Sequence, residues 1–239
     1  MSQGSLGWAG PAQSDLLVHL CGRPTNTRQT PHVPPDIASA SAAARLDRIL
    51  TTGQMKGFPP FGAEADQPTA CFSESPLPHL IHLLKRGWQP WGLLFTRQWV
   101  YDQGGEPVSY MRKARWDTRQ RQDKPFAVRL EADPGEGWSD WTHEREWRVP
   151  LDPQRPYLTL TPQSVAGILI GDSSWQPTPG WGPFINRISG QLSDGNDPFD
   201  EPWPEPPPIW TSAPKWLWNS STGQFLTSPQ APAPRAGIG

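Results

Sequence analysis

The sequence predicts a mixed α+β domain with a mostly antiparallel sheet and helices packed outside it. Two observations lead to this prediction. Short segments of alternating apolar residues, typical of strands, are separated by segments in which apolar residues recur at helical spacing. The 239 residues include 31 Pro and 22 Gly, which favour short elements and irregular connections. A chain of this length can bury a sizeable core in one medium-sized domain.

The first predicted elements are a strand over 16–21 and a helix over 36–53. In the strand, apolar residues alternate, so Val18 faces one side and His19 the other. In the helix, apolar residues recur at helical spacing and Gly53 is placed to end it.

The middle of the chain continues this alternation of strands and helices. Pro76 and Gly87 bracket an amphipathic helix, and Thr96 is placed to cap a short one. The helices are predicted at 76–87 and 96–105, and the strands at 69–75, 91–95, 106–111, 126–133, 141–150 and 164–172.

From about residue 193 the chain changes character. Ten prolines lie between Pro198 and Pro234, and such a density is incompatible with the interior of a helix or sheet. Four tryptophans in this segment indicate that its middle packs on the domain, while its last dozen residues are expected to be disordered. The sequence therefore predicts a domain over 1–192 and a Pro/Trp-rich C-terminal extension over 193–239.

Composition and missing motifs exclude several classes. The net charge of -2 does not indicate a nucleic-acid coat, and two cysteines are too few for a disulfide framework. No apolar run approaches a membrane span and no signal peptide is evident, so we expect a cytoplasmic protein without membrane contact. The motifs of dinucleotide-binding oxidoreductases, P-loop NTPases, zinc proteases and serine hydrolases are missing.

The stretch WTHEREWRVP at 141–150 carries the strongest candidate site. On a strand, Glu144 and Glu146 would share one face, and Trp141 and Trp147 the other. Two carboxylates on one face suit chemistry at a sugar, where one stabilises an oxocarbenium ion and the other positions or deprotonates a nucleophile. A solvated edge strand with alternating charges is the alternative interpretation.

Other polar residues also allow two interpretations. His19 is either a ligand contact or a core histidine with a backbone partner. Ser73 either binds a ligand or ends a strand. His79 and His82 form an HxxH pair, but no second ligand pair accompanies it, so no metal site is predicted.

The segment 112–129 breaks the neutrality of the chain. It contains seven basic residues and two acidic ones. It either contacts phosphates, through residues such as Arg115, Arg119 and Arg121, or forms an ordinary solvated helix and loop.

The order of these segments resembles a group of bacterial abortive-infection and phage-defence proteins. The likeness covers roughly 15–172 and depends on CFSES, on WGLLFTRQWVYDQGGEPVSYM, on HEREWRV and on SVAGILIGD. That group in turn resembles the ADP-ribosyltransferase superfamily, including toxins that modify DNA or RNA bases. The resemblance implies a split, mostly antiparallel sheet with flanking helices.

The resemblance also implies roles for individual residues around a bound NAD. His19 would hold the ribose and Ser73 would shape the nicotinamide pocket. Glu146 would be catalytic and Glu144 would be the acid near the acceptor. For an aromatic side chain that stacks on nicotinamide or the acceptor, the candidates are Trp99 and Tyr110.

The implied function is transfer of ADP-ribose from NAD to a macromolecule by a toxin or defence effector. The basic segment favours DNA or RNA over protein as acceptor. An antitoxin or a phage-derived protein would be a further partner. The alternatives are an NAD glycohydrolase and a non-catalytic interaction module on the same scaffold.

Overall fold

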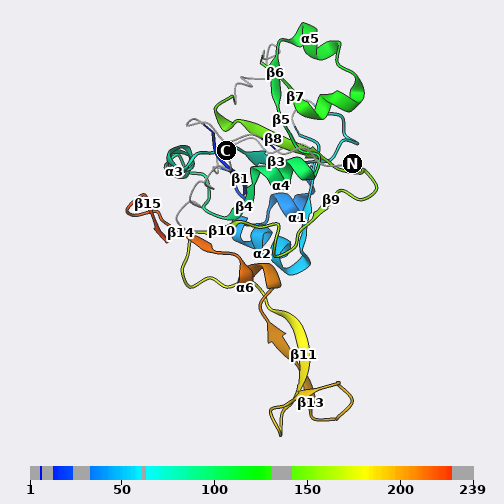
Figure 1. The fold of residues 1–239 in the computed structure, drawn as a ribbon, viewed down its shortest axis with the longest axis vertical. Helices are drawn as coiled ribbons and strands as arrows, with labels where there is room; N and C mark the ends of the chain where they lie inside the picture. Colours follow the sequence, from blue (N-terminus) through cyan, green and yellow to red (C-terminus); the bar gives the residue numbers. More distant parts are fainter. Residues whose placement is uncertain (1–5, 7–12, 24–32, 61–62, 131–141, 228–239) are drawn as a thin grey trace, which may run out of the picture.

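A sheet of eight strands runs through the centre of the molecule (Figure 1). Adjacent strands are antiparallel except for one parallel pair, β10 with β14. Side by side, they are β15 (Gln224–Thr227), β14 (Lys215–Asn219), β10 (Gly167–Ile170), β4 (Gly92–Thr96), β1 (Leu16–Leu20), β3 (Thr69–Ser73), β8 (Glu146–Pro150) and β5 (Glu106–Pro107). The predicted α+β class with a mostly antiparallel sheet is confirmed. This computed structural model describes residues 6, 13–23, 33–60, 63–130 and 142–227.

Apolar side chains form a core on each face of the large sheet. Leu17 lies in the core that includes α2 (Ala42–Thr52), and Val18 lies in the core that includes α3 (Leu77–Lys85). This is the alternation predicted for the first strand. The smaller elements around these cores are α1 (Pro35–Ala38), β2 (Gln54–Lys56), α4 (Arg97–Asp102), β9 (Tyr157–Thr159) and α6 (Pro208–Ser212). No helix in the described part of the chain is long and apolar enough to cross a membrane.

The predicted helix over 36–53 is two helices, because Ser41 starts a new one. Its side-chain oxygen accepts a hydrogen bond from the backbone N of Ala44 at 3.1 Å, which caps α2. Gly53 ends α2 in the left-handed conformation, as its position predicts. Thr96 likewise caps α4, accepting from the backbone N of Trp99 at 3.1 Å.

Beyond β5, a small lobe extends from the edge of the sheet (Figure 1). The strand predicted over 106–111 divides into β5 and β6. Of the strand predicted over 126–133, residues 127–129 form β7, and 131–133 lie outside the described residues. The lobe contains β6 (Ser109–Met111), α5 (Lys113–Asp117), the 3-10 helix η1 (Arg121–Phe126) and β7 (Ala127–Arg129).

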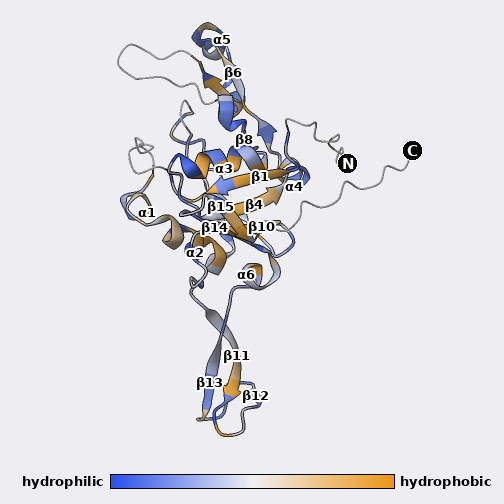
Figure 2. Ribbon diagram, turned by 90° about the vertical axis from the view of Figure 1, so that its left-hand side faces the viewer, coloured by the Kyte–Doolittle hydropathy of each residue, from blue (hydrophilic) through white to orange (hydrophobic). Residues whose placement is uncertain are grey.

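A second extension is an arm of three short strands that stands away from the sheet (Figure 2). It contains β11 (Gly180–Asn186), β12 (Leu192–Ser193) and β13 (Asp200–Glu205). The boundary predicted between residues 192 and 193 therefore falls inside this arm. Pro202 and Pro204 are tolerated because β13 is an edge strand, where a missing N–H breaks no ladder.

The C-terminal extension also contributes to the large sheet. No proline lies between Pro214 and Pro229, and in this stretch β14 pairs in parallel with β10. Trp216 and Trp218 are buried in the core on the α3 side. The segment is thus part of the fold and not only a covering on it. Its predicted disordered end lies outside the described residues.

Candidate functional site

The strand that carries Glu146 begins at that residue. Residues 142–144 form a short 3-10 helix, η2 (Thr142–Glu144), and Arg145 adopts a positive φ of 46°. A non-glycine residue in this region is uncommon and turns the chain sharply. The prediction of a strand over the whole of 141–150 is therefore wrong for 142–145, and Trp141 lies outside the described residues. The turn at Arg145, and not strand alternation, sets the position of Glu144.

Glu146 is bound on both oxygens by Arg148, two residues further along β8. Arg148 Nε lies 3.0 Å from Oε1 and Nη2 lies 2.9 Å from Oε2. Arg148 is only 1% exposed, and its Nη1 donates to the carbonyl of Pro125 at 2.8 Å. This arginine therefore fixes the Glu146 carboxylate and ties β8 to η1, at the junction between sheet and lobe.

The neighbouring strand supplies the next residues of the site. In the register of β3 with β8, Ser73 pairs with Glu146 and Cys71 pairs with Arg148. Paired residues of antiparallel strands share a face, so these four side chains lie together. Burial and the charge of Glu146 raise the pKa of the Cys71 thiol far above its usual range. The thiol is therefore protonated and is not an activated nucleophile.

Ser73 connects the two glutamates of the site. Its hydroxyl donates to the backbone carbonyl of Glu144 at 2.6 Å and lies 2.8 Å from the hydroxyl of Ser75. Ser73 thus holds η2 over the face that carries Glu146. Its hydroxyl is used to position the chain.

The carboxyl group of Glu144 titrates near neutral pH. Burial, and then the charge of Glu146, raise its pKa to about 7, while Arg23 and Arg148 act in the opposite direction. The site therefore combines a carboxylate held by an arginine with a carboxyl group that exchanges a proton near pH 7. Two carboxyl groups in different environments are typical of acid–base chemistry at a glycosidic bond.

His19 lies on the opposite face of the sheet from the glutamate pair. Val18 pairs with Ser73 and shares its face, so His19, the next residue, points to the other side. Its Nδ1 is 2.9 Å from the carbonyl oxygen of Cys71, and its ring packs 6.1 Å from that of Phe72. A carbonyl only accepts, so Nδ1 carries the proton. The structure thus does not bring His19 together with Ser73 and Glu146.

The two aromatic candidates lie in different places. The ring of Trp99 stacks on Phe95 at 4.9 Å and packs against the core on the His19 side. Tyr110, on β6, lies near Arg148. Burial acts to lower the pKa of Arg148, but charges including those of Glu146 and Tyr110 raise it overall. Of this pair, only Tyr110 acts electrostatically on a residue that binds Glu146.

The basic residues of the lobe are partly neutralised. Arg121 is paired with Asp66, and Lys124 lies 3.3 Å from Glu64. Arg115 and Arg119 are exposed, with no ion pair to another described residue. Of the three arginines predicted to bind an acceptor, these two are the better placed.

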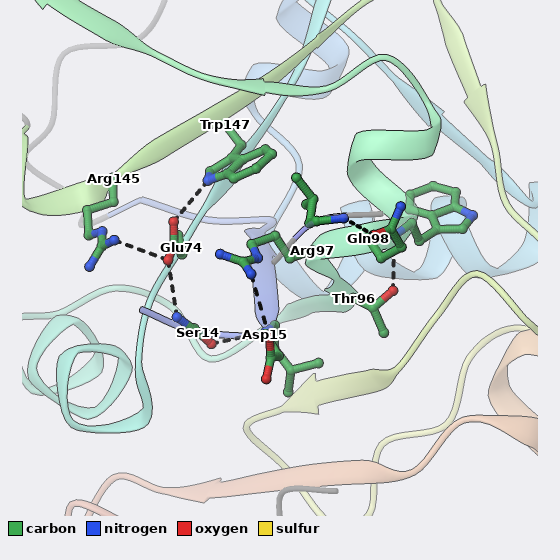
Figure 3. A network of polar contacts seen from close by, with 11 residues as sticks. Ser14, Asp15, Glu74, Thr96, Arg97, Gln98, Arg145 and Trp147 are labelled. Carbon is green, nitrogen blue, oxygen red and sulfur yellow. Dashed lines mark hydrogen bonds and ion pairs between the residues drawn. The ribbon is translucent and has the colours of Figure 1, made fainter. Parts of the chain in front are cut away.

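A second polar network lies on the other face of β3 (Figure 3). Glu74 is only 4% exposed and accepts from the backbone N of Ser14 at 3.1 Å and from Trp147 Nε1 at 3.0 Å. Arg145 Nη2 lies 3.2 Å from the same carboxylate. The bound oxygens of Glu74 explain its burial, so we assign it a structural role: it holds the turn before β8.

Sequence reasoning missed four residues around the site, and only one of them had a usable signal. Arg148 follows Glu146 by two residues, which on a strand places both on one face. Neither the burial of Cys71 nor the approach of Arg23 is visible in the sequence, and Glu74 is distinguished only by its place between two serines.

The chain matches no protein-family model, no curated protein and no solved structure.

Replacing Glu144 by Gln is expected to stabilise the protein above pH 7 and to have little effect near pH 4.5. Because the pKa of Glu144 is raised, the folded protein keeps a proton on this carboxyl group that the unfolded chain releases from about pH 4.5. The stability that this protonated group contributes is therefore lost as pH rises to about 7. Above pH 7 the variant should gain roughly 2–3 kcal/mol in the free energy of unfolding, which corresponds to roughly 5–10 °C in melting temperature. Thermal melts of both proteins at about pH 5 and pH 8 measure it. An equal difference at both values would contradict the raised pKa.

Proposed function

We propose that this chain transfers ADP-ribose from NAD to a macromolecular acceptor, on an ADP-ribosyltransferase-like scaffold, as a toxin or phage-defence effector. The observation that supports this best is the pairing of Glu146, held by Arg148, with Glu144, whose pKa is about 7. The resemblance of HEREWRV to that superfamily adds to it. The contact of His19 with the ribose is not part of the proposal, because His19 faces the other side of the sheet.

In the proposed reaction, each glutamate has one task. The bond between nicotinamide and ribose C1 breaks, and nicotinamide leaves with the bonding electron pair as a neutral molecule. Glu146 stabilises the positive charge that develops on the ribose. The acceptor then forms a bond to C1, and its proton passes to Glu144. A group with a pKa near the working pH is best suited to take that proton.

The experiment that tests this function measures nicotinamide release and label transfer from NAD with the full-length chain. Pools of single-stranded DNA, RNA and protein serve as acceptors. We expect release of nicotinamide and transfer of the label to a nucleic-acid pool. Release that does not depend on any acceptor identifies an NAD glycohydrolase instead. No release under any condition would overturn the enzymatic proposal.

A second candidate function, binding of a partner protein without catalysis, is favoured by the arm. Its exposed apolar side chains include Trp181, which is 79% exposed, Ile188 and Trp203. Such a concentration of large apolar groups on a projecting element is typical of an interaction surface. The nicotinamide assay separates the two candidates, because a binding module releases none.

Arg115 and Arg119 are expected to contact the phosphates of a nucleic-acid acceptor. Their joint replacement by Ala should reduce the slope of log affinity against log salt by about 1.4 for a single strand, because about 0.7 is lost per phosphate contact. Fluorescence anisotropy with a labelled oligonucleotide at several salt concentrations measures the slope. Arg121→Ala is the matched control, since Arg121 is already paired with Asp66. An unchanged slope in the double variant would exclude this contact.

A further inference from the structure

Three of the five histidines of the chain lie together, and one of them directly precedes Glu144. His79 and His82 are on α3, and His143 is on η2, immediately before Glu144. The ring centroids of His79 and His143 are 5.9 Å apart, and those of His79 and His82 are 6.2 Å apart. His79 is therefore the centre of the cluster. Two separate elements bring these rings together, and one of them also carries Glu144.

His79 is held in an unfavourable environment. Its Nε2 is buried and has no hydrogen-bond partner among the described residues. Burial lowers its pKa, and His143, His82 and Arg145 lower it further. An unpaired buried polar atom destabilises a fold, because it has lost its hydrogen bonds to water. The three rings would repel one another when protonated, and one ring nitrogen has no partner among the described residues. A bound ligand explains this arrangement of histidines better than packing does.

The character of the cluster indicates which ligand it takes. No group of three or more His, Cys, Asp or Glu side chains within the described ranges is arranged to hold a metal ion. Protonated imidazoles are hydrogen-bond donors, and the charged groups that act on His79 are His82, His143 and Arg145. The charge of Arg145 acts on His79 although Arg145 is paired with Glu74. The complementary ligand is an anion with several acceptor oxygens.

We propose that His79, His82 and His143 bind the diphosphate of the dinucleotide substrate. This inference rests on the proposed function, since it names where the charged part of NAD lies relative to Glu144 and Glu146. An anion would favour the protonated form of His79 and would supply an acceptor for its ring nitrogen. Because His143 directly precedes Glu144, the bound diphosphate would lie next to the carboxyl pair.

The test uses ADP, which carries the diphosphate but has no bond that the enzyme would break. Ring signals of the histidines are followed by NMR while pH is varied, with ADP, with adenosine and without ligand. ADP should raise the pKa of His79, and adenosine should leave it unchanged. ADP should also bind at least tenfold more tightly at about pH 6 than at about pH 8, because protonated rings bind the anion. The ring of His19, on the other face of the sheet, is an internal control.

Variants test the same site by affinity. His79→Gln and His143→Gln should each weaken ADP binding about tenfold, the loss of one charged hydrogen bond. Arg187→Gln is the control, since it removes a positive charge from the arm, where Arg187 pairs with Glu201 and not with the cluster. We expect that variant to retain its ADP affinity within about twofold.

Several results would overturn the site. One is that the histidine signals stay unchanged with ADP, and another is that His19 responds to ADP as strongly as the three clustered histidines. A third is that Zn²⁺ shifts the signals of the three rings while ADP does not. A response to a DNA oligonucleotide but not to ADP would assign the phosphates to an acceptor and not to the dinucleotide. ADP binding does not depend on NAD cleavage. Binding of ADP without nicotinamide release would therefore support this site and reject the transferase proposal. Nicotinamide release without ADP binding would reject this site and leave the transferase proposal standing.

Discussion

Glu146→Gln is expected to lower the rate of nicotinamide release from NAD about 100- to 1000-fold, the typical loss of one preorganised electrostatic contact. Gln keeps the shape and hydrogen-bonding capacity of Glu146 but cannot stabilise positive charge on the ribose. Glu144→Gln should retain nicotinamide release and reduce transfer to the acceptor, because Glu144 is proposed to take the acceptor's proton. Single-turnover assays of both products at about pH 7 measure the two effects.

The control must separate lost charge from lost structure, since Glu146 also pairs with the buried Arg148. Glu64→Gln is a control, because it removes by the same substitution a carboxylate that pairs with Lys124 and is not part of the site. We expect Glu64→Gln to retain nicotinamide release, and thermal melts of both variants measure any loss of structure. Comparable losses in the two variants would indicate a general structural effect. Identical behaviour of the Glu144 and Glu146 variants would contradict the division of tasks between them.

Arg148→Met is expected to destabilise the protein by about 3–5 kcal/mol, because it leaves the carboxylate of Glu146 largely buried without its partner. It also removes the hydrogen bond to the carbonyl of Pro125, which connects the lobe to the sheet. For a chain of this size the melting temperature should fall by roughly 10–15 °C. Urea denaturation with an unchanged m-value measures the loss of stability.

A double variant shows whether the loss comes from the unpaired charge. Glu146→Met with Arg148→Met removes both members of the pair, and such replacements are often neutral or stabilising. We expect it to recover most of the stability lost in Arg148→Met while showing no nicotinamide release. If Arg148→Met alone lies within about 1 kcal/mol of the original protein, the pair does not stabilise the junction.

Features that depend on neighbouring residues were predictable from the sequence. The alternation in residues 16–20 correctly assigns Leu17 and Val18 to different cores, because successive residues of a strand point to opposite faces. Thr96 and Gly53 mark helix ends because a hydroxyl cap and a left-handed residue act within one turn. The α+β class follows from many such local signals together.

The composition of the C-terminal extension was a poor guide to its place in the fold. Its prolines predict a segment outside any sheet, yet Lys215–Asn219 pairs with Gly167–Ile170 inside the large sheet. Proline excludes a backbone N–H only where it occurs, and the five residues of that strand contain none. Which strand a short apolar segment joins depends on residues far away in the sequence.

The candidate site shows the same division. The sequence by itself determined that Glu146 and Arg148 share a face and that His19 faces away from Val18, because these relations hold within one strand. Only the tertiary structure decided that Val18 lies opposite Ser73, which places His19 across the sheet from the glutamates. It also decided that a left-handed turn at Arg145, held by Glu74, brings Glu144 back to Glu146. Strand register and buried long-range contacts are set by how the whole chain packs, and no local pattern records them.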